Sequence, residues 1–180
     1  MTLASYITLL RIFLIIPIIY LTSLNIFIAN IIALVLFIVA AVSDSLDGYI
    51  ARKTQTETDL GALLDLVADK LLVCLLLIWL VSLNNSLFFV LPVLIIVLRE
   101  LSISSLRQNI AESQVENNIQ VSKIGKSKTT MQFIAIGLIV ISPEMSVSFY
   151  NLALFFLWLS SAISLISFYV YVSRWIQSSD

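Results

Sequence analysis

The chain has 180 residues, of which 60% are hydrophobic and only 12% are charged, and its mean hydropathy is +1.05. A soluble protein of this length could not hide so much apolar surface, so the composition excludes a soluble enzyme or binding module. A net charge of −1 offers no basic face for a nucleic acid, and the absence of histidine excludes a His-based general base, catalytic triad or zinc site.

Six apolar segments follow one another along the chain, separated by short polar breaks. They cover residues 8–24, 26–50, 61–81, 87–106, 129–141 with its flanks, and 147–175. A helix needs roughly 20 apolar residues to cross a bilayer core of about 30 Å. The sequence therefore predicts an all-α polytopic membrane protein with six transmembrane helices and a single domain over residues 1–180. Because Arg11 interrupts the first segment, an alternative places residues 2–10 along the membrane surface as an amphipathic entry.

The connections between the segments differ in charge. Those after the first, third and fifth segments, at residues 22–25, 82–86 and 142–146, contain no Lys or Arg. All ten basic residues lie in the other connections or in helix segments that reach that side. By the positive-inside rule, this basic side and both termini face the cytosol. The first segment lacks the features of a signal peptide, so we expect an integral protein of a bacterial-type inner membrane with its first span retained.

Four aspartates lie where the second segment ends and the third begins. Asp44 and Asp47 are three residues apart, and Asp65 and Asp69 are four apart, so each pair shares one helical face. A carboxylate near membrane depth costs about 2.5–3.5 kcal/mol, so four of them call for a compensating function. The turn at residues 53–60 is short and makes the two helices neighbours, which allows the four carboxylates to converge.

Converging carboxylates would repel one another unless one or two hard divalent cations neutralised them. We therefore expect Mg²⁺ or Mn²⁺ at this place, with two ions favoured. Gly48 and Gly61 lie on the aspartate faces, where a missing side chain lets a ligand approach the backbone. For any single aspartate, the alternative is a helix cap or an ion pair with Arg52 or Lys70, but all four spacings together favour a metal site.

These residues form one long pattern, Asp-x-x-Asp-Gly-x-x-Ala-Arg, then eight residues, then Gly-x-x-x-Asp-x-x-x-Asp. With it, the chain resembles the CDP-alcohol phosphotransferases over nearly its full length. The resemblance implies that ions bind the diphosphate of a CDP-linked lipid while an alcohol attacks the β-phosphorus and releases CMP. The implied metal ligands are Asp44, Asp47, Asp65 and Asp69, and Asp69 is also implied as the base that deprotonates the alcohol. The implied CDP-lipid pocket comprises Gly48, Ala51, Arg52 and Gly61, although Arg52 could instead be an interface anchor.

Basic residues in the second half of the chain bear on the acceptor alcohol. Arg99 and Arg107 are eight residues apart on one predicted helix, and Lys126 and Lys128 follow in a Gly-Lys-Ser-Lys-Thr stretch. Such a cluster favours an anionic acceptor, because Arg offers a fork and Lys a point charge to phosphate oxygens. We expect these four cations to bind the acceptor phosphate and Glu100 to orient one of the arginines. The alternative is that the cations only set the topology.

The basic segments, together with residues 8–11, resemble the branch of the family that makes phosphatidylglycerophosphate from CDP-diacylglycerol and glycerol 3-phosphate. Synthases of phosphatidylserine, phosphatidylinositol phosphate or cardiolipin are alternatives within the family. A membrane prenyltransferase is an alternative from another class, but its aspartate motifs lie far apart in sequence. A divalent-cation transporter would need a polar path through the second and third segments, which these lack. The resemblance also implies a homodimer surrounded by membrane lipids.

Overall fold

The computed structural model describes residues 3–54, 59–84, 86–112 and 123–179. Within these ranges, side chains are described except at residues 3–7, 44–54, 59–66, 69, 107, 109–112, 123–127, 174 and 177–179. The described residues form six α-helices and one short 3₁₀ turn. The elements are α1 (Leu3–Ser23), α2 (Phe27–Thr54), α3 (Asp59–Leu83), α4 (Leu87–Glu112), α5 (Lys123–Ile141), η1 (Ser142–Glu144) and α6 (Val147–Ser179). The predicted all-α class is thereby confirmed for the described part of the chain.

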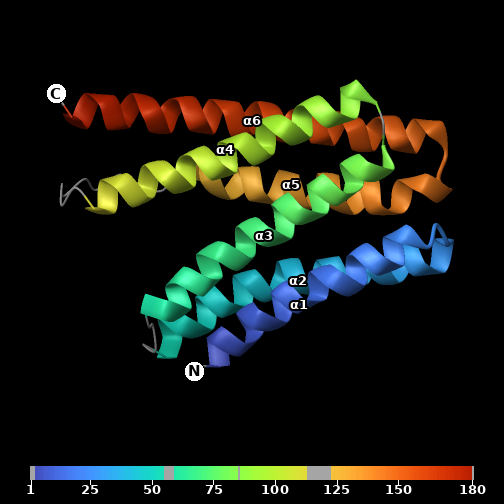
Figure 1. Cartoon of the computed structure of the whole chain (residues 1–180), viewed down its shortest axis with the longest axis horizontal. Helices are drawn as coiled ribbons and strands as arrows, with labels where there is room; N and C mark the ends of the chain where they lie inside the picture. Colours follow the sequence, from blue (N-terminus) through green and yellow to red (C-terminus); the bar gives the residue numbers. More distant parts are fainter. Residues whose placement is uncertain (1–2, 55–58, 85, 113–122, 180) are drawn as a thin grey trace.

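The helices alternate in direction, so their connections gather at two ends of the molecule (Figure 1). The ends of α1, α3 and α5 and the starts of α2, α4 and α6 lie at one end, and the start of α1, the end of α6, the facing ends of α2 and α3 and those of α4 and α5 lie at the other. The three connections without Lys or Arg therefore share one end, as the sequence predicts. Residues 3–10 belong to the same continuous helix as Arg11, which favours a first span over a separate surface segment.

The molecule has two halves joined by α3. Helix α1 packs on both α2 and α3, while α6 packs on α4 and α5. Helix α3 crosses between the halves (Figure 1) and reaches α4 and α5, and α2 also contacts α5. The core between them is built from close-packed aliphatic side chains and one aromatic pair, Phe37 with Phe133, whose ring centroids are 5.8 Å apart.

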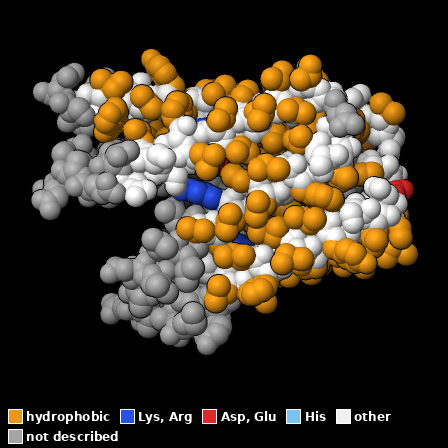
Figure 2. Space-filling view, in the orientation of Figure 1, with side chains coloured by type: hydrophobic (Ala, Val, Ile, Leu, Met, Phe, Trp, Pro, Cys, Tyr) orange, Lys and Arg blue, Asp and Glu red, His pale blue; other side chains and the backbone are white. Residues whose placement is uncertain are grey.

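The outward faces of the helices are apolar and several inward faces are polar. On α1, Phe13 and Ile16 are 66% and 67% exposed, whereas Thr8 and Arg11 are buried. The visible surface is covered largely by hydrophobic side chains (Figure 2). Exposure of these apolar side chains is unfavourable in water but not in lipid hydrocarbon, where it is exposed polar groups that are unfavourable. The distribution therefore indicates association with a membrane.

Two described stretches are long and apolar enough to cross a bilayer by themselves, Leu87–Leu106 in α4 and Val147–Ser173 in α6. Helices α1, α2 and α3 contain shorter apolar stretches, Thr8–Ser23, Phe27–Ser43 and Lys70–Leu83. The helical architecture is thus clear, while the crossing of all six helices stays a prediction.

Helices α2 and α5 approach closely at Gly137, because a Cβ atom added there would lie 3.2 Å from Cδ1 of Leu34. The substitution Gly137→Val should therefore destabilise the protein by about 1–3 kcal/mol, since the extra carbons force the two helices apart. Thermal unfolding in detergent measures this effect. The control is Ile134→Val on the exposed face of α5, and an equal loss in both variants would contradict the close approach.

Candidate active site

The aspartate pattern lies on two consecutive helix ends. Asp44 and Asp47 belong to the last turns of α2, and Asp65 and Asp69 belong to the first turns of α3. The two helix ends lie at the same end of the molecule (Figure 1). Thr54 and Asp59, the bounding residues, are five positions apart, so they lie within about 18 Å of each other. The backbone therefore brings the two aspartate-bearing ends close together.

The side chains of this pattern lie outside the described residues. Convergence of the four carboxylates and the lining of the CDP-lipid pocket therefore stay predictions. The chemistry of the donor set still fits a hard divalent cation, because two carboxylates from each of two neighbouring helices supply only oxygen ligands. The positions concerned are Asp44, Asp47, Gly48, Ala51, Arg52, Gly61, Asp65 and Asp69.

A second polar site lies at Glu100 on α4. Its carboxylate pairs with Nζ of Lys128 on α5 and lies 3.4 Å from Nη1 of Arg99. Glu100 and Lys128 are only 8% and 5% exposed. Because a buried charge is costly unless it is paired, this contact favours the charged state of both residues. Glu100 contacts an arginine, as expected, but it also holds a lysine that the sequence did not link to it.

Neutral side chains extend this contact across three helices. Nη2 of Arg99 donates to Oγ of Ser167 on α6 at 2.6 Å. Nε2 of Gln132 on α5 lies 3.4 Å from Oε1 of Glu100 and 3.5 Å from Oγ of Ser164 on α6. Arg99 is therefore bonded to α6 and Lys128 to α4, and these bonds to neighbouring helices fix the orientation of both side chains. We call this set the Glu100 network, comprising Arg99, Glu100, Lys128, Gln132, Ser164 and Ser167.

Helix α3 joins this network through Lys70. The Nζ atom of Lys70 donates to Oγ of Ser104 on α4. Lys70 also borders a cavity of about 20 Å³ that is lined by Glu100, Lys128 and Gln132, among others. Lys70 directly follows Asp69 in the chain. The α3 turn that carries the predicted base therefore adjoins the buried cations of the second half.

Basic side chains are visible in a recess between the two halves, toward the end that holds the termini (Figure 2). The described basic side chains are Arg11, Lys70, Arg99 and Lys128. Basic side chains gathered in a recess raise the local positive potential and attract anions. Such a recess is suited to an anionic ligand.

Of the four residues predicted to bind the acceptor phosphate, the structure brings Arg99 and Lys128 together through Glu100. Arg107 and Lys126 lie on α4 and α5, but their side chains are outside the described residues. Sequence reasoning missed Gln132 and the serines of α6. One signal for them was available, because Gln132 is one turn after Lys128 and Ser160, Ser164 and Ser167 form a polar stripe in an apolar helix.

Comparisons with known proteins agree with the resemblance seen in the aspartate pattern. Residues 1–167 match a family described as CDP-alcohol phosphatidyltransferase. The CDP-diacylglycerol–glycerol-3-phosphate 3-phosphatidyltransferases of Shigella flexneri serotype 5b (strain 8401) and Escherichia coli (strain K12) are similar to this chain. Each is 38% identical to it over 141 residues, which is 78% of this chain and 76% of the relative.

Proposed function

Because the chain belongs to the CDP-alcohol phosphatidyltransferase family, we propose that it transfers the phosphatidyl group of CDP-diacylglycerol to glycerol 3-phosphate. The products are phosphatidylglycerophosphate and CMP. The relatives named for this reaction support the choice of both substrates. Membership of an enzyme family with this substrate class leaves no support for the prenyltransferase and cation-transporter alternatives.

The observation that carries the choice of acceptor is the position of the buried cations beside the α3 turn of Asp69. Among the described residues, Lys70 borders the same small cavity as Glu100 and Lys128, and Arg99 lies 3.4 Å from the Glu100 carboxylate, so three cations gather there. A phosphate monoester brings two negative charges and several acceptor oxygens, for which such cations are suited. Choline and ethanolamine carry positive charge and would be repelled.

The aspartates of α2 and α3 would hold one or two Mg²⁺ or Mn²⁺ ions. When bound, such ions would supply positive charge against the diphosphate of the nucleotide lipid. Such hard cations prefer oxygen ligands, and carboxylates supply only oxygen. The residues concerned are Asp44, Asp47, Asp65 and Asp69.

In the proposed reaction, the acceptor hydroxyl oxygen bonds to the β-phosphorus and the bond from that phosphorus to CMP breaks. Asp69 accepts the hydroxyl proton, which a carboxylate can do when it lies within hydrogen-bond reach. Arg99 and Lys128, with Arg107 and Lys126, hold the acceptor phosphate and so orient the hydroxyl. The CDP-lipid is held by Gly48, Ala51, Arg52 and Gly61.

We further infer that all six helices cross the membrane and that the aspartate end faces the cytosol, at the inner membrane of a bacterial-type cell. The connections without Lys or Arg lie together at the other end, which supports this orientation. Surrounding lipids would cover the exposed apolar side chains. We also expect a homodimer, which size measurement of the detergent-solubilised protein can test.

CMP release by the purified protein tests the proposed function. With CDP-diacylglycerol and Mg²⁺ present, glycerol 3-phosphate should give CMP and phosphatidylglycerophosphate, whereas EDTA should abolish both products. Serine, inositol phosphate and phosphatidylglycerol serve as competing acceptors in parallel reactions. A metal-dependent product from one of these and none from glycerol 3-phosphate would show that the acceptor is wrong while the family chemistry holds.

A further inference from the structure

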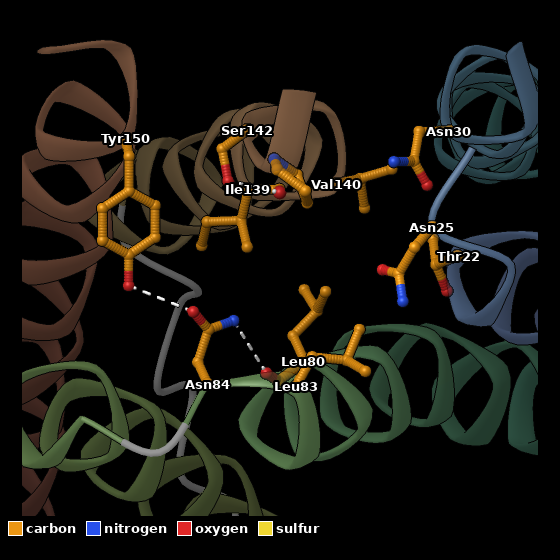
Figure 3. Close-up of a pocket in the computed structure, with 11 residues that line it drawn as sticks. Thr22, Asn25, Asn30, Leu80, Leu83, Asn84, Ile139, Val140, Ser142 and Tyr150 are labelled. Carbon is orange, nitrogen blue, oxygen red and sulfur yellow. Dashed lines mark hydrogen bonds between the residues drawn. The ribbon is translucent and has the colours of Figure 1, made fainter. Parts of the chain in front are cut away.

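A second cavity lies at the opposite end of the molecule from the aspartate helices, among the connections that carry no basic residue. Its volume is about 170 Å³, and its walls come from α1, α2, α3, α5, η1 and α6 (Figure 3). Thr22, Asn25, Asn30 and Asn84 supply polar groups, together with Ser142 and Tyr150. None of the described residues that line it is charged. The cavity is therefore polar but electrically neutral.

Most of the polar groups in these walls already bond to one another or to the backbone. Tyr150 Oη donates to Oδ1 of Asn84 at 3.1 Å, and Nδ2 of Asn84 donates to the carbonyl of Leu80 at 3.1 Å (Figure 3). Oγ1 of Thr22 accepts from Trp79 at 2.9 Å and donates to the carbonyl of Ile18 at 2.9 Å. These contacts hold the walls in place.

Asn30 differs from the other polar residues of the walls. Its side chain is 1% exposed, and within the described part of the chain neither Nδ2 nor Oδ1 has a hydrogen-bond partner. In Figure 3 it projects from α2 toward Val140. A buried amide without partners is strongly unfavourable, and such groups in folded proteins almost always meet a protein group, a water or a ligand. Asn30 therefore points to an occupant of the cavity.

The chemistry of the walls selects among possible occupants. An ion would leave water without an opposite charge to compensate it, and an apolar ligand would leave the Asn30 amide unpaired. Hydroxyl groups both donate and accept, so neighbouring hydroxyls can serve Nδ2 and Oδ1 together. At about 30 Å³ per water molecule, this volume is room for roughly five water-sized groups, which is the size of a small polyol.

We infer that this cavity binds a neutral polyol group, through the side-chain amide of Asn30. The polyol could be a free molecule or the head group of a lipid. Exposed apolar residues on the adjoining turns, including Leu24, Phe27 and Leu83, would contact the acyl chains in the second case. The inference is independent of the proposed reaction, because the cavity and the aspartate helix ends lie at opposite ends of the molecule.

The test observes the side-chain amide of Asn30 directly by NMR, with ¹⁵N-asparagine in the full chain. The protein is held in a zwitterionic detergent without hydroxyl groups, because a sugar detergent would itself supply a polyol. The Asn30 signal is assigned by its loss in Asn30→Leu, or in Asn30→Ser if the leucine variant does not fold. Asn151, exposed on α6, provides the reference signal.

Two probes separate the sources of the polyol. Free glycerol is titrated in one series, and phosphatidylglycerol is compared with phosphatidylcholine in the other. A saturable shift of the Asn30 signal is expected with free glycerol or with phosphatidylglycerol alone, while Asn151 shows no saturable change. No saturable shift with either probe, or parallel shifts of Asn30 and Asn151, would overturn the inference and leave a cavity filled by water.

Discussion

Replacement of Asp69 by asparagine should lower kcat for CMP release by about 10²–10⁴-fold, because the amide cannot accept the hydroxyl proton of the acceptor. Its shape is almost unchanged, and three other aspartates of the pattern are retained. Binding of CDP-diacylglycerol should therefore persist. Single-turnover CMP release, with binding of the nucleotide lipid measured in parallel, separates these two effects.

The matched control for this variant is Glu144→Gln, which neutralises an exposed carboxylate of η1 at the other end of the molecule. It should retain the activity of the unmodified protein. If Asp69→Asn kept more than about a tenth of kcat, another group would have to accept the proton. If both variants lost activity equally, the effect would reflect loss of the fold.

Removal of the Lys128 charge should impair both stability and use of the acceptor. In Lys128→Met, Glu100 loses its ion-pair partner on α5 but keeps Arg99 and Gln132, so the loss of stability should be smaller than the cost of about 3–5 kcal/mol for leaving a buried charge unpaired. The KM for glycerol 3-phosphate should rise about 10–100-fold, the equivalent of one charge-assisted hydrogen bond. The KM for CDP-diacylglycerol should stay nearly constant.

A double variant separates the two roles of Lys128. Adding Glu100→Gln removes the carboxylate that Lys128→Met leaves underpaired, so the double variant should be less destabilised than the sum of the single variants. Its KM for glycerol 3-phosphate should nevertheless stay high, because no charge has been restored for the phosphate. Recovery of a normal KM in the double variant would mean that Lys128 acts only by stabilising the fold.

Hydropathy predicted the number and order of the helices well because each apolar run had a clear polar break. It predicted their ends less well. The predicted segment at 87–106 ends within α4, which continues to Glu112, and the segment at 129–141 begins inside α5, which starts at Lys123. Hydropathy marks the part of a helix that faces lipid or core, whereas backbone hydrogen bonding continues through polar residues beyond it.

The two parts of the site differed in how far the sequence could predict them. The aspartate pattern is local, so helical periodicity alone placed each pair on one face. The Glu100 network depends on which faces of α4, α5 and α6 meet, and no local pattern shows this. The sequence therefore linked Glu100 only to an arginine. In the structure it also pairs with the buried Lys128, which is 28 positions away. The sequence analysis did not single out the α6 serines that complete the network, because a polar stripe on one helix does not show which helix it meets.

The central claim is that carboxylates from α2 and α3 share divalent ions at one place. Anomalous diffraction from crystals grown with Mn²⁺ and CDP-diacylglycerol tests it most directly. The account predicts manganese peaks at about 2.0–2.3 Å from carboxylate oxygens of both helices, in a site that also contacts the diphosphate. Manganese bound by one helix alone, or the four carboxylates too far apart to share an ion, would contradict it.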